Sequence, residues 1–276
     1  MLKIYLKNNR ILMCKSRQIS NKRNDHSSLI HETDFLSCNL INVKKAAAEI
    51  RQKYPRENKV QIILSPTMAL SKIFPLDKNC SKKETLLYLS ANAVSLFSLN
   101  AKRLIINHQP THLTTPLATT IYWQAVASKK RIIRALMQGF AEEGILVTNI
   151  YDFFSHLTHS LNSIKSERSI FISYQNLEFI FLIYDKKIPI YTWHEKITAQ
   201  DFSANLQRQL ILFKHHHKEF TPLQHIILNL PNKLENKFNL STLTGNPHIT
   251  TEKIKFPLDH LILGTLKNEK QTRPER

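Results

Sequence analysis

The sequence predicts an α/β protein in which strands alternate with single helices. Three observations support this fold class. Residues 121–157 read as a strand, an amphipathic helix, a second strand and the beginning of another helix. Residues 170–193 contain three short apolar runs separated by turn residues, which is typical of a β-meander. The two halves of the chain also repeat one coarse order of segments: a hairpin or meander, then a helix, then a short buried strand.

The segment 121–157 carries the strongest local signals. Residues 121–127 favour a strand, and the Ser128 hydroxyl is placed to accept a hydrogen bond from the first N–H groups of a helix. Five apolar residues then share one helical face: Ile132, Ile133, Leu136, Met137 and Phe140. Gly144 follows them, where a positive φ ends a helix without steric cost. Because the basic beginning and the acidic end of this helix oppose its dipole, packing against a sheet must hold it.

Length and composition limit the class of protein. The 276 residues suffice for two domains with a sizeable core. No apolar run reaches the roughly 18 residues of a membrane span, and lysines interrupt any N-terminal signal peptide. The three cysteines, Cys14, Cys38 and Cys80, lack the spacing of a disulfide framework or a metal knuckle. We therefore expect a cytoplasmic protein without a bound metal.

The balance of charge points to an acidic partner. The chain has 39 Lys and Arg against 21 Asp and Glu, a formal net charge of +18. Nucleic acid and an anionic membrane surface both fit this excess, and so does a surface that is merely basic. The sequence shows neither a cluster of arginines nor the alternation of basic and aromatic residues found in domains that stack bases. Charge alone leaves these interpretations open.

The remaining elements follow from periodicity, capping residues and turn residues. In the first half, the predicted elements are a hairpin (2–6 with 11–14), a polar basic loop (15–28), a helix (43–54), a strand (60–64), an extended segment (68–76), a helix opened by a capping box at Ser81–Glu84, a strand (103–107) and a polar loop (108–120). In the second half they are three strands (170–174, 177–184 and 188–193), a helix opened by 198–201 with a buried face of Phe202, Leu206, Leu210 and Phe213, a strand (225–230), a short helix (240–243) and a solvated tail (268–276).

Two pairs of histidines are candidates for metal ligands or catalytic groups. Pro110 lies between His108 and His112, so these two cannot share one helical face. His156 and His159 can share a face, but no carboxylate accompanies them as a further ligand. We therefore predict neither a metal site nor a catalytic residue.

Two blocks of the chain resemble the PilM family of type IV pilus assembly proteins and, within it, the HofM-like branch of competence pili. Residues 64–84 resemble the family's strand, extended run and following helix. Residues 123–157 resemble a second block of the family, including Gly144 and Asp152. The pattern covers roughly residues 40–265.

The resemblance implies an actin-like fold, which is a duplicated RNase H-like fold of two domains. The first domain would span residues 1–162 and carry a small inserted subdomain at about 67–120. The second domain would span 163–266, and residues 267–276 would form a flexible tail.

The phosphate-binding positions of that fold lack their glycines in this chain. Members of the family that bind ATP carry a glycine-bearing turn after the first strand of each half, where backbone N–H groups approach the phosphates. This chain has Lys7–Arg10 and Ser173–Asn176 at those turns, and Asn229–Pro231 where the family has a glycine pair beside the adenosine. The resemblance with these departures implies a protein without enzymatic activity and without a nucleotide cofactor. A weak actin-like ATPase is the alternative.

The resemblance also implies a partner and a location. The partner would be a PilN-type bitopic inner-membrane protein, whose cytoplasmic N-terminal peptide would lie in a groove between the main domain and its insertion. The chain would then be a cytoplasmic scaffold, peripheral to the inner membrane, of a competence pilus that supports DNA uptake and utilization. The alternatives are a nucleic-acid-binding protein and the cytoplasmic domain of a type II secretion L-type protein, a family that continues into a membrane helix.

Segments 64–76 and 121–136 would line that groove. Six residues are the candidates for contact with the peptide: Ser65, Met68, Phe74, Trp123, Arg131 and Arg134. Phe74 and Trp123 are more typical of a core, and they would anchor a peptide only if exposed. A nearby anionic membrane surface would suit the positive charge of the chain.

Overall fold

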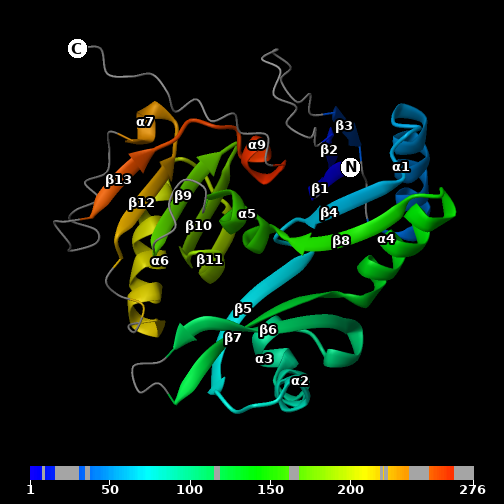
Figure 1. Ribbon diagram of the computed structural model, residues 1–276. Helices are drawn as coiled ribbons and strands as arrows, with labels where there is room; N and C mark the ends of the chain where they lie inside the picture. Colours follow the sequence, from blue (N-terminus) through cyan, green and yellow to red (C-terminus); the bar gives the residue numbers. More distant parts are fainter. Residues whose placement is uncertain are drawn as a thin grey trace, which may run out of the picture.

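The computed structural model describes residues 1–7, 10–15, 31–34, 38–114, 119–161, 168–217, 220, 223–235 and 249–263. Its strands form two five-stranded sheets and one three-stranded sheet. When the strands of each five-stranded sheet are numbered along the chain within that sheet, their spatial order is third, second, first, fourth and fifth in both sheets. The repeat expected from the sequence is therefore present in the topology, and the two large sheets lie on opposite sides of the upper part of the molecule (Figure 1).

The first sheet contains, in spatial order, β3 (His31–Asp34), β2 (Arg10–Lys15), β1 (Leu2–Lys7), β4 (Lys59–Leu64) and β8 (Leu146–Asp152). β1 and β2 form the predicted hairpin, with Lys7 opposite Arg10. β4 and β8 run parallel to β1. Helices α1 (Leu40–Lys53) and α4 (Lys130–Glu142) cover the outer face of this sheet (Figure 1), and their apolar side chains share one core with β1 and β4.

Capping residues and one glycine set the bounds and the packing of these helices. Helix α1 begins before the predicted start at residue 43, because Asn39 Oδ1 accepts a hydrogen bond from Asn42 N at 2.9 Å. After α4, Gly144 has a φ of +68°, as its position in the sequence predicted. The two helices pack so closely that a Cβ at Gly139 would lie 2.6 Å from Val43 Cγ1.

The second sheet contains, in spatial order, β11 (Ile188–Lys196), β10 (Glu178–Asp185), β9 (Ser169–Gln175), β12 (His225–Asn229) and β13 (Thr250–Lys253). Strands β9, β10 and β11 form the predicted antiparallel meander. Helix α6 (Phe202–His216) packs its predicted apolar face against this sheet, and a short helix α7 (Asn232–Glu235) follows β12. The predicted helix at 240–243, the tail at 268–276 and, apart from Lys15, the loop at 15–28 lie outside the described residues.

A subdomain is inserted between β4 and α4. Its antiparallel sheet has the order β5 (Ala69–Asp77), β7 (Thr120–Lys129) and β6 (Leu104–Thr114). Its helical segments are α2 (Lys82–Ala91), α3 (Ala93–Phe97) and the 3-10 turn η1 (Ala101–Arg103). Ser81 and Glu84 form the predicted capping box at the beginning of α2. The side chains buried in this subdomain include Phe74, Leu89, Phe97 and Trp123.

Two predictions about this subdomain are wrong. Residues 108–114 are not a loop, because β6 continues to Thr114 and pairs with β7. Their polar side chains are compatible with a strand that is covered on one face only. Ser128 does not cap α4, because β7 continues to Lys129 and the Ser128 hydroxyl donates to the Met68 carbonyl oxygen at 2.8 Å. Pairing along both edges of β7 extends the strand past the residue that the sequence favoured as a cap.

Helices α5 (Phe153–Leu161) and α9 (Leu258–Leu263) lie between the two five-stranded sheets (Figure 1). One core joins Tyr5 and Ile63 of the first sheet to Phe171 and Leu182 of the second, through the apolar faces of both helices. All four side chains are at most 3% exposed. The two halves therefore bury a common core, and packing holds their relative position.

His156 makes the stability of this common core depend on pH. It lies on α5 beside the Tyr151 ring, and burial, together with the charges of Lys3 and His159, lowers its pKa from 6.5 to about 4. In that range the unfolded chain binds a proton that the folded protein excludes, so the free energy of unfolding decreases as the pH falls. Between pH 7 and about pH 4.5 we expect His156 to account for a loss of about 1–3 kcal/mol.

Urea unfolding of the wild type and of His156→Gln at both pH values measures this contribution. Glutamine cannot be protonated in this range, so the variant should lose less stability on acidification than the wild type. An equal loss in both proteins would show that other groups cause the pH dependence.

Candidate functional site

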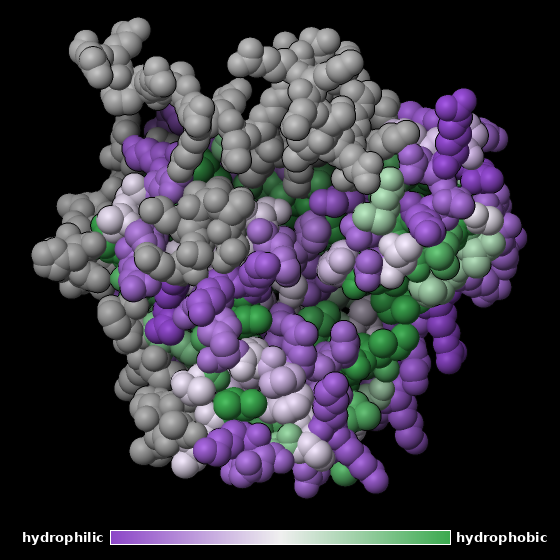
Figure 2. All heavy atoms as spheres, viewed as in Figure 1, coloured by the Kyte–Doolittle hydropathy of each residue, from purple (hydrophilic) through white to green (hydrophobic). Residues whose placement is uncertain are grey.

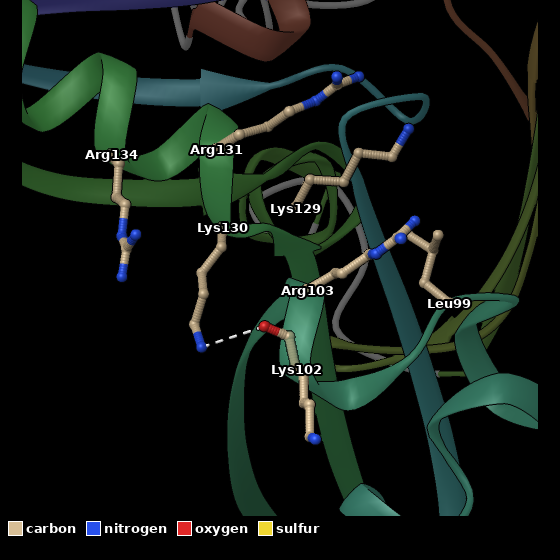
Figure 3. A pocket seen from close by; sticks show the side chains of 7 residues that line it. All are labelled: Leu99, Lys102, Arg103, Lys129, Lys130, Arg131 and Arg134. Atoms are coloured by element: carbon tan, nitrogen blue, oxygen red, sulfur yellow. Dashed lines mark hydrogen bonds between the residues drawn. The ribbon is translucent and has the colours of Figure 1, made fainter.

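A pocket of about 630 Å³ opens where the inserted subdomain meets α4. We call it the cationic pocket, and its lining consists of Leu99, Lys102, Arg103, Lys129, Lys130, Arg131 and Arg134 (Figure 3). Six of these seven side chains are basic and none is acidic. The space-filling view shows apolar and hydrophilic residues side by side in this part of the surface (Figure 2).

Strand pairing brings two separate basic segments of the chain together at this pocket. Lys129 ends β7 and continues directly into α4, whose first turn carries Lys130 and Arg131. Lys102 and Arg103 end η1, and the next residue begins β6, which pairs with β7 opposite Lys129. Lys130 Nζ donates to the Lys102 carbonyl oxygen at 3.2 Å and so ties the two segments together (Figure 3).

The beginning of α4 has an unusual distribution of charge. Its first turn contains no acidic residue, and its N-cap residue, Lys129, makes no side-chain cap hydrogen bond. The N–H groups at a helix N-terminus carry partial positive charge, so the basic side chains there are unfavourable for the helix. None of the six basic side chains forms an ion pair with an acidic residue in the described part of the chain. An anion bound in the pocket would reduce the repulsion among the basic side chains. It would also offset their unfavourable interaction with the positive end of the helix dipole.

A second pocket, of about 540 Å³, lies where all three parts of the molecule meet. We call it the polar pocket. Its lining comes from β6 and β7 of the inserted subdomain, β8 and α5 of the first half, and, in the second half, the connection between β10 and β11 and the first residue of β11. The lining residues are Asn107, His108, Gln109, Gln124, Val126, Asn149, Ile150, Tyr151, Asp152, Ser155, His159, Lys187 and Ile188.

Gln124 connects the parts around the polar pocket. Its side chain is buried, and its Nε2 donates to Ser71 Oγ at 3.1 Å and to Ser155 Oγ at 2.7 Å. Its Oε1 accepts a hydrogen bond from Gln109 Nε2 at 3.1 Å. At the edge of the pocket, burial raises the pKa of Asp152, although Asp152 Oδ1 accepts a hydrogen bond from Ser155 N. Both donors of the Gln124 amide are used within the protein, whereas Asn107 and Asn149 line the same pocket with exposed side chains, which suits the backbone of an extended peptide.

The six predicted groove residues lie in three different places. Arg131 and Arg134 line the cationic pocket. Ser65 and Met68 lie in the connection between β4 and β5, where Ser65 is buried with its hydroxyl bonded to Thr67 and Met68 is half-buried. Phe74 and Trp123 pair across β5 and β7 and are each only 4% exposed, so they are core residues and not surface anchors. The grouping of all six in one peptide groove stays a prediction.

Sequence reasoning missed four of the basic residues that form the cationic pocket. Lys102 and Arg103 form one visible basic pair, and Lys129 and Lys130 precede Arg131 in another run. Nothing in the sequence shows that these runs face each other, because their proximity depends on the register of β6 on β7. The sequence also gave no sign of clustered arginines, yet three arginines line this pocket.

The actin-like resemblance places phosphate-binding turns in the β1–β2 hairpin and in the β9–β10 hairpin. In this protein, side chains join these two hairpins. Lys7 Nζ, at the end of β1, lies 3.2 Å from Glu178 Oε2, at the beginning of β10, and 3.6 Å from Asp259 Oδ1 of α9. Asn176 and Leu177 form the turn between β9 and β10 with φ values of +51° and +65°. Side chains therefore occupy a turn in which phosphate binding would favour glycine.

A hydrogen-bond network fills the space beside that turn. Gln175 Nε2 donates to Asn229 Oδ1 at 3.0 Å and to the Phe256 carbonyl oxygen at 2.8 Å. Gln175 Oε1 accepts a hydrogen bond from Leu258 N at 3.0 Å. These bonds fix the second hairpin to the segment that leads into α9.

The histidine pairs are not arranged as metal sites. Within the described ranges, no three His, Cys, Asp or Glu side chains lie in an arrangement that could hold a metal ion. His108 Nε2 instead lies 3.1 Å from the Lys82 carbonyl oxygen, and His112 Nε2 lies 3.4 Å from Asp185 Oδ1. Likewise, no helix in the part of the chain that the structure describes is long and apolar enough to cross a membrane.

Comparison with known proteins finds likeness in structure only. No protein-family model matches the chain, and no curated protein matches its sequence. A PilM–PilN type IV pilus biogenesis complex is similar with a TM-score of 0.64 and 10% identity, over 91% of this chain and 87% of that chain. A Bacteroides thetaiotaomicron protein with an actin-like ATPase fold and unknown function has a TM-score of 0.53 and 12% identity, over 96% of this chain and 95% of that chain.

The cytoplasmic domain of EpsL, an inner-membrane component of the type II secretion system of Vibrio cholerae, is also similar. Its TM-score is 0.53 at 10% identity, over 95% of this chain and 92% of that chain. At such low identity these similarities show the fold and nothing finer. The chain has the actin-like fold, with two related halves and a subdomain inserted into the first.

Proposed function

We propose that this protein is a non-enzymatic scaffold of a pilus or secretion machine at the inner membrane. The observation that carries the proposal is the likeness to the PilM–PilN complex, which extends over 91% of this chain and 87% of that one. The similarity to the cytoplasmic domain of EpsL points to the same class of assembly. Within that class, we propose a competence-pilus scaffold that supports DNA uptake, peripheral to the membrane and bound to a PilN-type membrane protein.

The proposed absence of a nucleotide cofactor rests on the joined hairpins. A triphosphate between them would have to displace Lys7 from Glu178 and Asp259. It would also meet the side chains of Asn176 and Leu177 instead of glycine backbone. A scaffold that binds a partner through a pocket needs no catalytic group, and this role agrees with the arrangement of the described residues.

The polar pocket is the proposed site of the partner's peptide. It lies between the inserted subdomain and both halves, so a peptide in it would contact all three parts. Its amide side chains can bond an extended backbone, while Val126 and Ile150 supply apolar contact. The resemblance implied a groove between the main domain and its insertion; the polar pocket lies at such a boundary, but none of the six predicted contact residues lines it.

A titration with the cytoplasmic N-terminal peptide of a PilN-type membrane protein tests this proposal. We expect binding by fluorescence anisotropy, and we expect Asn149→Trp to weaken it about tenfold or more, because the indole fills the pocket. Leu146→Trp is the matched control, since Leu146 is exposed on the same strand but does not line the pocket. Absence of binding by the wild type, or equal binding by both variants, would refute the proposed site.

A further inference from the structure

The cationic pocket is not explained by the proposed scaffold function. Six basic side chains line one cavity, and two separate segments of the chain, η1 and the junction of β7 with α4, must fold together to form it. Like charges held around one cavity repel one another, and water screens this repulsion only in part. The beginning of α4 adds to the cost because its dipole also opposes cations. Such an arrangement is stabilised when an anion binds.

Partial burial and one hydrogen bond limit the movement of the lysines that line the cationic pocket. Lys129 and Lys130 are half-buried, and the hydrogen bond from Lys130 to the Lys102 carbonyl oxygen holds the two basic segments in place. In Figure 3, Arg103, Lys129 and Arg131 point to the right of the view, whereas Lys102, Lys130 and Arg134 point downward. The positive charge is therefore distributed over two sides of a pocket with the volume of a small-molecule site.

This distribution favours an anion whose charge extends over more than one group. The planar guanidinium groups of Arg103, Arg131 and Arg134 match the paired oxygens of a phosphate, and the lysines add charge without a fixed geometry. A peptide carboxylate carries one charge per side chain and would leave most of the six unpaired. A nucleic-acid strand spreads its phosphates along an extended track, whereas these cations line one pocket, and Arg103, Lys129 and Arg131 point to the same side of it.

We propose that the cationic pocket binds a ligand with two or more adjacent phosphates, such as the phosphate chain of a soluble oligophosphate or the diphosphate head of a polyprenyl lipid. The site is separate from the joined hairpins, where the ion pairs of Lys7 occupy the position of phosphates in this fold. It is also separate from the polar pocket, because the two linings have no residue in common. The proposal therefore stands whether or not the scaffold function is correct.

Isothermal titration with sodium tripolyphosphate, against sodium sulfate at the same ionic strength, tests the site. We expect the wild type to bind tripolyphosphate at least about tenfold more tightly than sulfate, since several groups engage at once. Arg103→Glu/Arg131→Glu should lower the affinity for tripolyphosphate about 30-fold or more. Arg103→Lys/Arg131→Lys keeps the charge but loses the planar groups, so a smaller loss of about threefold to tenfold is expected.

The matched control is Lys53→Glu/Arg208→Glu, which changes the net charge equally at two exposed positions on α1 and α6. It should bind tripolyphosphate within about twofold of the wild type. The melting temperature separates binding from folding: Arg103→Glu/Arg131→Glu should melt at or above the wild-type temperature without ligand, because an acid in the first turn of α4 favours the helix. A lower melting temperature for this variant would contradict the claim that the basic residues are unfavourable without an anion.

Two further measurements identify the source of the phosphates. Vesicles of phosphatidylcholine with a few per cent undecaprenyl diphosphate should retain the wild type if the ligand is a lipid head group, and tripolyphosphate should then compete. Binding of tripolyphosphate without retention by these vesicles would assign a soluble ligand. The proposal fails if neither probe binds, if the control variant loses as much affinity as the pocket variant, or if a single-stranded DNA oligonucleotide binds more tightly than tripolyphosphate and depends on the same arginines.

Discussion

Lys7→Glu is expected to lower the free energy of unfolding by about 2–4 kcal/mol, somewhat less than the loss of a fully buried ion-pair partner. The side chains of Lys7, Glu178 and Asp259 are 23%, 13% and 31% exposed, so all three charges are largely removed from water. The substitution removes the cation and places a third carboxylate beside two others. Because these residues connect β1, β10 and α9, the ends of the two hairpins should separate.

Chemical denaturation of three variants measures this effect. The exchange Lys7→Glu/Glu178→Lys should recover most of the lost stability, because it restores an opposite pair across the same hairpins. Lys45→Glu is the control, since Lys45 is exposed on α1 and takes no part in the ion pairs of Lys7. If the exchange is no more stable than the single variant, the ion pair does not join the halves. A rise in the melting temperature of Arg103→Glu/Arg131→Glu with ATP and Mg²⁺ would likewise show that nucleotide still enters between the hairpins, because this variant lacks two arginines of the cationic pocket.

Gly139→Ala is expected to destabilise the protein by about 1–3 kcal/mol, although alanine favours a helix by about 1 kcal/mol over glycine. The added Cβ would lie 2.6 Å from Val43 Cγ1 and 3.2 Å from the backbone nitrogen of Lys44. Val43 is fully buried, and its β-branched side chain has few alternative rotamers in a helix. Helices α1 and α4 must therefore move apart to admit one methyl group.

A double-mutant cycle with Val43→Ala distinguishes this clash from other effects. In the Val43→Ala background, Gly139→Ala should become neutral or stabilising, because the methyl group then enters the space that valine vacated. Gln138→Ala, at an exposed neighbouring position of α4, should change stability by less than about 0.5 kcal/mol. If Gly139→Ala raises the stability of the wild type, the close contact between α1 and α4 does not limit the packing.

Local signals in the sequence predicted those parts of the fold that neighbouring residues decide. The meander of β9, β10 and β11, the capping box of α2 and the glycine after α4 each depend on residues within a few positions of one another. The duplication was predicted because the same coarse series of segments occurs twice, whereas the spatial order of the strands comes from the structure. The structure and its likeness to an actin-like ATPase fold confirm this architecture.

Features that depend on contacts between residues far apart in the sequence could not be predicted from local signals. Ser128 is a good capping residue, but β5 and β6 pair with β7 on both sides and keep it in the strand. The cationic pocket requires that residues near 102 and near 130 meet, which is a consequence of strand register and not of composition. The proposed peptide site is harder still to predict, since the lining of the polar pocket comes from both halves and from the insertion.

The common core around α5 and α9 has a mechanical consequence. Many proteins with two domains open and close about a flexible hinge. Here, close-packed side chains fill the region between the two halves and resist a hinge motion. A force applied to the inserted subdomain would therefore rotate the two halves together as one rigid body. A partner held on one side of the protein could then displace whatever is attached to the opposite side, without consuming a nucleotide.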